Sequence, residues 1–253
     1  MKKAFDTNSE YHSSKAISAS GLKKIASSSV FDYLNQINKE TDAMRRGTAI
    51  HEAIYEPENF EKNYYKMPKV DGRTKEGKAE KLIHLDLAKN KIVFDEIEYN
   101  TILKIARNVR EHELAKKYIT GIIEQSHYFE YNDVQCRCRP DCFDSVEGWI
   151  SDVKSIRNIN GRSIPYEIKD RNYDVQAVAY SEWMNIPVEN FRFIFCETNH
   201  PFKVEVVALS NEQIERGTKR FKDALNKWKF YLETGIIETI PANDYAEDGA
   251  KIF

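Results

Sequence analysis

The spacing of apolar residues predicts helices in the first half of the chain. Residues 17–36 carry a rough apolar stripe at helical spacing, and Ser18 or Ser20 is the expected N-cap. Residues 41–56 form a second predicted helix, which stops before Pro57 because proline cannot continue a helix. This second helix has a buried face.

The apolar pattern changes after Gly121 from helical spacing to short strand-like runs. Further helices are predicted at about 76–90, 95–118, 170–185 and 211–233, and residues 65–77 have the composition of a loop. The expected strands are Ile122-Ile123, Tyr128-Phe129, 134–139, 148–156, 191–196 and 204–208. Helices that alternate with strands in this order predict one α/β domain over residues 1–253, with a mixed central sheet flanked by helices.

The bulk composition is that of an ordinary globular protein. Of 253 residues, 41% are hydrophobic and 31% are charged, and no apolar run approaches the ~20 residues needed to cross a bilayer. The first residues turn polar at once, which is unlike a secretion signal. The four cysteines show no disulfide-like framework. We therefore expect a reduced, cytoplasmic protein with no membrane partner.

The net charge of −2 argues weakly against a nucleic-acid partner, but the charges are unevenly spread. Residues 62–91 are rich in lysine, whereas residues 238–248 are acidic. Charge therefore leaves a DNA partner open.

Two carboxylates and a lysine form the strongest chemical signal. Asp152 and Lys154 lie two apart in a predicted strand, so they project from the same face. Asp141 lies eleven residues earlier and follows Pro140; it becomes a neighbour of Asp152 if the strands pair across the turn at 145–148. Alone, an Asp-x-Lys pair is more often a solvated surface strand. Here the strand is largely apolar, so the charges need a reason, and two carboxylates suit magnesium or manganese.

Two weaker signals fit the same site. His51 lies in the predicted helix at 41–56 and offers an imidazole to a metal, although a lone helical histidine is more often a packed or surface residue. Gln176 and Tyr180 lie one turn apart on another helix, where an amide and a phenol can contact a phosphate or a water.

In this order, four motifs resemble the RecB-like branch of the PD-(D/E)XK nucleases. They are Gly47-Thr48-x-x-His51, Pro140-Asp141, Asp152-Val153-Lys154 and Gln176-x-x-x-Tyr180. Further segments resemble the RecE exonuclease domain in particular, namely Tyr11-His12, Ile17-Ser18-Ala19-Ser20, Arg73-Thr74-Lys75-x-Gly77-Lys78, Glu124-Gln125-Ser126 and Cys136-Arg137-Cys138-Arg139. The resemblance covers about residues 11–235 and leaves a short acidic tail at 238–253. It implies a restriction-endonuclease-like core. The third acidic motif is Asp-x-Lys here, where Glu-x-Lys is commoner.

The resemblance also implies roles for the matching residues. His51, Asp141 and Asp152 would bind Mg²⁺, with the Val153 carbonyl as a further oxygen and Mn²⁺ as a substitute. Lys154 would orient the attacking water. Gln176 and Tyr180 would steady the phosphate and the geometry of the active site, and Glu124 would assist without being a ligand. The sequence is compatible with one ion or two. The expected DNA contacts are Arg45, Arg46, Arg73, Lys75, Lys78, Arg137 and Arg139, of which at least half are expected to be ordinary surface residues.

The activity implied by the resemblance is that of a RecE-like exonuclease. Such an enzyme degrades one strand of linear duplex DNA from 5′ to 3′ and leaves a 3′ tail for a single-strand annealing partner, as in phage recombination. It also implies a ring-shaped homo-oligomer. Two alternatives stay open: a RecB-like nuclease acting on flaps, single strands or internal sites, and a catalytically idle DNA-binding scaffold. The complete set of motifs argues against the scaffold.

Other chemistry is disfavoured by the sequence. Cys136, Cys138 and Cys142 have only the distant Cys196 as a fourth thiol, so an iron–sulfur cluster is not expected. Neither a phosphate-binding loop nor a dinucleotide fingerprint is present, so ATP and a dinucleotide cofactor are not expected.

Overall fold

A five-stranded mixed sheet forms the centre of the molecule. The computed structural model describes residues 2–37, 39–237, 244–245 and 251–252. The strand order is β11-β10-β9-β8-β5, with bounds β5 (Ile122–Ile123), β8 (Cys142–Asp144), β9 (Trp149–Ile156), β10 (Phe191–Glu197) and β11 (Val204–Val207). Strands β9 and β10 are parallel, and the other neighbouring pairs are antiparallel. The predicted α/β fold with a mixed central sheet is confirmed.

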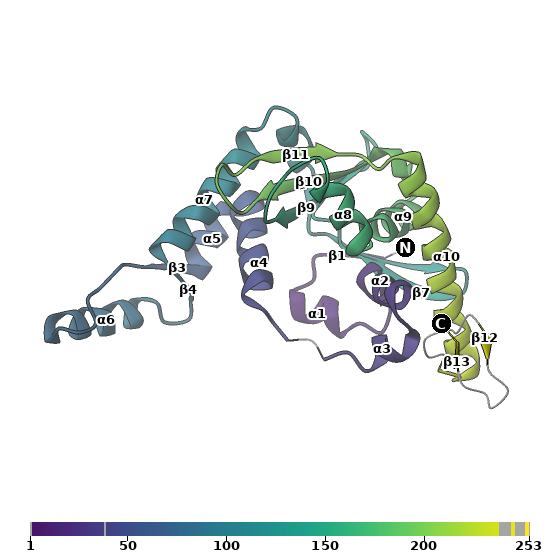
Figure 1. Ribbon diagram of the computed structural model, residues 1–253, viewed down its shortest axis with the longest axis horizontal. Coiled ribbons are helices and arrows are strands. Elements are labelled where there is room, and N and C mark those ends of the chain that lie inside the picture. The colour runs from purple at the N-terminus through teal and green to yellow at the C-terminus, as the bar shows by residue number, and fades with distance from the viewer. Residues whose placement is uncertain (1, 38, 238–243, 246–250, 253) are drawn as a thin grey trace.

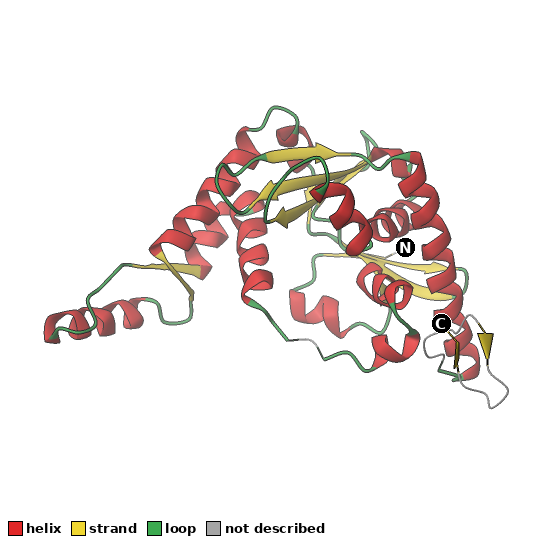
Figure 2. Ribbon diagram, viewed as in Figure 1, coloured by secondary structure: helices red, strands yellow, loops and turns green. Residues whose placement is uncertain are grey.

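Both faces of the central sheet are buried, because successive residues of β10 enter two different hydrophobic clusters. Phe193 and Phe195 face the cluster that includes α9 (Tyr173–Met184) and α10 (Asn211–Thr234). Ile194 and Cys196 face the cluster that includes α4 (Asp42–Tyr55) and α7 (Glu96–Glu111). Each fully buried side chain of this size contributes roughly 1.5–3 kcal/mol. The result is a layer of helices on each side of the sheet, as Figure 2 shows.

Helix α9 is held close to α10 by a glycine and an ion pair. A Cβ atom at Gly217 would lie 2.8 Å from the backbone oxygen of Asp174, so a larger residue forces the two helices apart. The neighbouring Arg216 places its Nε 2.7 Å from Oδ2 of the buried Asp174. This contact fixes the position of the helix that carries Gln176 and Tyr180.

A second, four-stranded sheet lies beside the first. Its order is β1-β6-β7-β2, with bounds β1 (Lys2–Ala4), β6 (Ser126–Tyr131), β7 (Val134–Cys138) and β2 (Ile17–Ser18). The chain leaves β7, passes through residues 139–141 and enters β8 of the central sheet. Residues 139–141 therefore bridge the two sheets.

An arm projects from the body of the molecule. Its base is the parallel pair β3 (Tyr64–Met67) and β4 (Ile92–Asp95), preceded by α5 (Pro57–Asn63). Helix α6 (Lys75–Leu87) connects the two strands and extends away from the other helices (Figure 1). The predicted loop at 65–77 is therefore wrong at both ends, which belong to β3 and α6. The predicted helix at about 76–90 is confirmed.

The predicted helix at 17–36 is wrong as a single element. It consists of α2 (Ala19–Ser27), which Ser18 caps, and α3 (Val30–Leu34), which Ser29 caps. Serine side chains compete for backbone hydrogen bonds, so the run of serines at 27–29 interrupts the helix. In contrast, α4 confirms the helix at 41–56, since it is capped by Thr41 and ends before Pro57.

The later helices match more closely. The segment at 95–118 is α7 followed by the 3₁₀ turn η1 (Ala115–Ile119), while α9 and α10 confirm the helices at 170–185 and 211–233. The helices α1 (Asn8–Ser13), α5 and α8 (Ser163–Asp170) and the short turn η2 (Val188–Asn190) were not predicted from the sequence.

At the C-terminal end, β12 (Asp244–Tyr245) pairs with β13 (Lys251–Ile252), and the rest of the predicted acidic tail at 238–253 lies outside the described residues. Within the described part of the chain, every helix is too short or too polar to span a bilayer.

Candidate active site

Two carboxylates meet at the open end of the β8–β9 hairpin. Asp141 directly precedes β8, and the pairing of Cys142 with Ser151 places it opposite Asp152. One oxygen of Asp141, Oδ2, accepts a hydrogen bond from the backbone nitrogen of Val153 at 2.6 Å. The predicted pairing across this turn is confirmed, and it places the two carboxylates side by side.

Asp152 is held by two groups of the chain. It is 2% exposed on the sheet face that packs against α9. Its Oδ1 forms an ion pair with the ammonium of Lys154, and its Oδ2 accepts a hydrogen bond from the side-chain amide of Gln176. Burial alone would lower the pKa of Lys154, but attraction to Asp152 and Asp141 outweighs it and the pKa is raised. Lys154 is therefore a permanent cation beside the carboxylates.

Two residues that the sequence analysis missed complete this side of the site. Tyr173, at the start of α9, has the Lys154 ammonium 4.9 Å from its ring centroid. Lys23 of α2 donates a hydrogen bond to Gln176 Oε1 at 3.0 Å. The Lys23–Gln176 contact joins residues 153 positions apart, so no local sequence pattern predicts it.

His51 approaches the carboxylates from the opposite helix layer. From α4 its Nε2 lies 3.0 Å from the carbonyl oxygen of Val153, and its Nδ1 lies 3.3 Å from Asp141 Oδ2. Burial lowers the pKa of His51, although the charge of Asp152 opposes this. A neutral imidazole carries a proton on one nitrogen only, so the lone pair of the other nitrogen faces an oxygen lone pair, which is unfavourable. A bound cation removes that conflict.

Glu124, which was expected to assist without being a ligand, lies directly beside a carboxylate of the site. Its left-handed backbone (φ 50°) and the hydrogen bond from its nitrogen to the Asp141 carbonyl, 3.2 Å, place it directly beside Asp141. Burial and the charge of Asp141 raise the pKa of Glu124 to about 7, even though Arg139 Nε lies 3.0 Å from its Oε2. Glu124 therefore adds a third carboxylate to the site, beside Asp141 and paired with Arg139.

The donor atoms of His51, Glu124 and Asp141 fit a divalent metal. One ligand atom from each lies within 4.8 Å of the others. Burial and the neighbouring Asp152 raise the pKa of Asp141 well above its usual value, as expected where two carboxylates share a site without a cation. Mg²⁺ and Mn²⁺ favour such oxygen-rich sets. This group includes Glu124, and the oxygens of Asp152 contact Lys154 and Gln176.

Tyr180 supports the strand and not the open site. It is 8% exposed, and its hydroxyl donates to the backbone oxygen of Arg139 at 3.4 Å. Burial raises the pKa of Tyr180 well above its ordinary value. Of the two roles expected for this residue, the contact matches the maintenance of site geometry.

A cavity of about 810 Å³ opens onto His51 and Glu124. Its wall is built by α4, by the segment that contains Glu124 and Arg139, and by the N-terminal segment. The lining residues from that last segment are Phe5, Asp6, Thr7, Asn8 and His12. Of the charged groups described above, His51, Glu124 and Arg139 line this cavity, whereas Asp141, Asp152 and Lys154 are not among its lining residues.

The structure separates the residues predicted to contact DNA. Arg139 alone lines the cavity. Arg45 and Arg46 form ion pairs with Asp42 and Glu98. Arg73, Lys75 and Lys78 are exposed, and the last two belong to α6, which extends away from the body of the molecule (Figure 1).

Arg137 has a structural position. It is 6% exposed, donates to the backbone oxygen of Ser14, and lies 4.8 Å from the ring centroid of Tyr11. Its burial argues against the DNA contact expected from the sequence.

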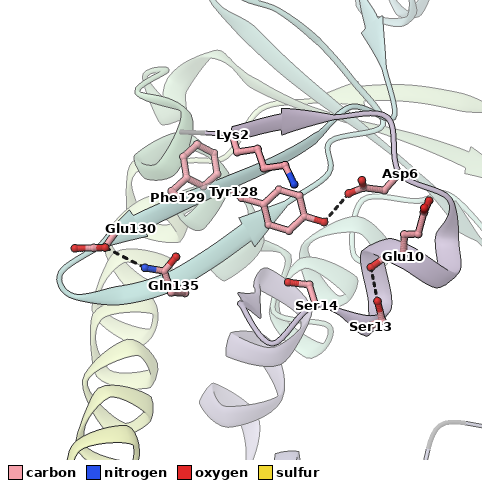
Figure 3. Close-up of a pocket in the computed structure, with 9 residues that line it drawn as sticks. All are labelled: Lys2, Asp6, Glu10, Ser13, Ser14, Tyr128, Phe129, Glu130 and Gln135. Atoms are coloured by element: carbon pink, nitrogen blue, oxygen red, sulfur yellow. Dashed lines mark hydrogen bonds between the residues drawn. The ribbon is translucent and has the colours of Figure 1, made fainter.

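A second cavity, of about 740 Å³, lies on the four-stranded sheet beside α1 (Figure 3). Within it Tyr128 donates to Asp6 at 2.5 Å, and Gln135 donates to Glu130 at 3.0 Å. These side chains pair with one another, so the cavity has the character of a polar surface groove.

The four cysteines are buried free thiols. Cys136 and Cys138 lie in β7, as expected for a strand whose small side chains face the interior. Burial raises the pKa of Cys136, Cys142 and Cys196 to about 12. All four thiols therefore act as small apolar side chains.

A solved structure shares this fold at low sequence identity. The structure of a candidate exonuclease from Eubacterium rectale aligns with a TM-score of 0.63 at 15% identity, over 94% of this chain and 90% of that one. A phage-related exonuclease from Haemophilus somnus aligns at a TM-score of only 0.39 and 12% identity, over 90% of this chain and 100% of that one, so it carries no argument. No curated protein matches the chain.

A family model identifies the fold directly. The model of the PDDEXK-like domain of unknown function (DUF3799) matches residues 18–235, a span that contains His51, Glu124, Asp141, Asp152, Lys154 and Gln176. The chain therefore belongs to this family of PDDEXK-like domains.

Proposed function

We propose that the chain is a metal-dependent DNA nuclease. The observation that carries the proposal is the convergence of His51, Asp141, Asp152 and Lys154 from α4 and one strand hairpin. This arrangement places hard metal donors next to a permanent cation, which is the requirement for hydrolysis of a phosphodiester. Such a site has no evident use in a protein that only binds DNA.

The chain's own residues divide the chemistry between them. A bound Mg²⁺ ion would supply an activated water and offset charge on the phosphate, and Mn²⁺ would substitute for it. His51, Glu124 and Asp141 would hold the ion, with the Val153 carbonyl and Asp152 beside it. Lys154 would orient the attacking water and stabilise negative charge developing on the phosphate oxygens.

The proposed substrate is the end of a duplex. The motifs resemble those of RecE, and the Eubacterium rectale protein of the same fold is described as a candidate exonuclease. By that resemblance the chain degrades one strand from 5′ to 3′, works as a ring-shaped homo-oligomer, and hands the 3′ tail to a single-strand annealing protein. A nuclease for flaps, single strands or internal sites remains the alternative.

A digest of labelled DNA tests this proposal. Linear duplex labelled at its 5′ or 3′ end is incubated with Mg²⁺ or EDTA, beside a covalently closed circle and beside the Asp152→Ala variant. We expect early release of the 5′ label as mononucleotide, dependent on Mg²⁺ and on Asp152, with the circle intact.

Two other outcomes would support the alternative functions. Nicking or linearisation of the circle would favour the alternative nuclease. Binding of DNA without any metal-dependent product would leave the scaffold hypothesis in its place.

A further inference from the structure

Lys23 reaches the proposed active site from outside every motif identified in the sequence. It lies on α2, in the layer that packs against α9. Its ammonium donates to Gln176 Oε1 at 3.0 Å and lies 5.1 Å from the ring centroid of Tyr173. The other face of the same network is formed by Lys154, 4.9 Å from that ring centroid.

The two ends of the Gln176 amide are chemically different, and each has one partner. The oxygen accepts from Lys23, and the nitrogen donates to Asp152. A carboxylate accepts only from the amide nitrogen, and an ammonium donates only to the amide oxygen. Lys23 and Asp152 therefore select the same orientation of the amide and lock it from both sides.

An ammonium in this position needs a functional or structural reason. Burial lowers the pKa of Lys23 to about 7, and the charge of Lys154 acts in the same direction. Placing a lysine beside a second lysine disfavours its charged form. Among the described residues, Gln176 Oε1 accepts a hydrogen bond from this ammonium, which partly offsets the cost of its burial.

We propose that Lys23 is a positioning residue that fixes the Gln176 amide and, through it, the carboxylate of Asp152. The inference rests on the proposed nuclease function, because Asp152 matters only if the site is catalytic. Lys23 contacts neither the metal donors nor the cavity. Its effect is to prevent the Asp152 carboxylate from rotating away from Lys154 and the neighbouring Asp141.

The adjacent Lys24 offers a matched control. It lies on the same helix and is also partly exposed. A Lys→Met substitution keeps most of the side-chain length at either position and removes one charge. Comparing Lys23→Met with Lys24→Met therefore separates the loss of the Gln176 contact from the loss of a lysine on α2.

The test combines these variants with Gln176→Met and the Lys23→Met/Gln176→Met double variant. Loss of an outer partner of a metal-site residue costs about 10–100-fold in activity. We expect Lys23→Met to lower kcat on linear duplex by at least about tenfold with an unchanged KM and a melting temperature within about 4 °C of wild type. Lys24→Met should match wild type. In the Gln176→Met background, Lys23→Met should cost almost nothing more.

Two results would overturn the proposal when the wild type cleaves DNA. One is a normal kcat for Lys23→Met. The other is a loss that multiplies with that of Gln176→Met, which shows that Lys23 acts independently of the amide.

A structural readout distinguishes failure of this inference from failure of the proposed function. The side-chain amide resonance of Gln176, assigned by its disappearance in Gln176→Met, should shift in Lys23→Met and not in Lys24→Met. If the wild type cleaves no DNA, the nuclease proposal fails, and an unshifted resonance in Lys23→Met separately overturns the positioning role.

Discussion

The imidazole Nε2 of His51 lies 3.0 Å from the carbonyl oxygen of Val153, which connects α4 to the central strand β9. This is a hydrogen-bond distance, and the other ring nitrogen lies 3.3 Å from Asp141 Oδ2. From this position between the helix and the strand, His51 would help to hold the proposed metal ion.

Removal of this imidazole should weaken metal binding. We predict that His51→Ala raises the Mg²⁺ concentration needed for half-maximal cleavage at least about tenfold, since even the loss of an outer partner has that effect. A titration of activity with Mg²⁺ measures it, with His200→Ala, which replaces an exposed histidine, as the control. An unchanged Mg²⁺ requirement would remove His51 from the proposed ligand set.

Arg139 and Arg137 form a matched pair with different expected effects. Arg139 lines the cavity, whereas Arg137 is buried against Ser14 and Tyr11. Arg139→Met should weaken DNA binding and reduce the slope of log affinity against log salt by about 1. Arg137→Met should instead cost on the order of 1–3 kcal/mol of stability, because it leaves the part-buried carbonyl of Ser14 without its donor. Binding at several salt concentrations and urea denaturation of both variants test this, and equal salt slopes would contradict it.

His127 should make the fold sensitive to acid. It is 1% exposed in β6, and neither ring nitrogen has a hydrogen-bond partner among the described residues. Burial lowers its pKa from 6.5 to about 4. Between about pH 6.5 and pH 4, His127 is therefore protonated in the unfolded chain but neutral in the folded one. The free energy of unfolding falls as the pH is lowered through this range, by about 3 kcal/mol in all.

The variant His127→Leu removes this proton uptake. Between pH 7 and pH 4.5 its free energy of unfolding should fall less than that of wild type, as measured by urea denaturation at both values. An equal loss in both proteins would show that the acid sensitivity originates elsewhere.

Gly217 should tolerate no side chain. A methyl group there meets the backbone of Asp174, which belongs to α9. Gly217→Ala is expected to destabilise the protein by roughly 1–3 kcal/mol, the usual cost of overpacking, despite the higher helix propensity of alanine. Thermal unfolding measures the effect, and an increase in melting temperature would mean that α9 and α10 separate without cost.

The sequence predicted the parts of the site that depend on short-range geometry. Residues two apart share a face of a strand, so Asp152 and Lys154 could be placed together, and the turn at 145–148 allowed Asp141 to be added. The same local logic predicted α4 and its end before Pro57. These features depend on neighbours within about a dozen residues.

The rest of the site depends on contacts that no local pattern encodes. Glu124 lies beside Asp141 because of its left-handed backbone, and Lys23 meets Gln176 across 153 positions. The parallel pair β3–β4 was missed for a similar reason, because its strands are short and separated by α6. Polar pairs formed by tertiary packing were therefore invisible in the sequence.

The most direct test of the central claim is cleavage of linear duplex DNA by wild type, Asp141→Asn and Lys154→Met, each with Mg²⁺, with EDTA, and with Mg²⁺ restored after EDTA. Folding of each variant is verified by circular dichroism. We predict that wild type cleaves only with Mg²⁺ and recovers on its return, and that either substitution lowers the rate at least about 100-fold, comparable to the loss of one strong electrostatic contact to a transition state. Undiminished cleavage by a folded Asp141→Asn or Lys154→Met variant, or cleavage in EDTA, would contradict the account.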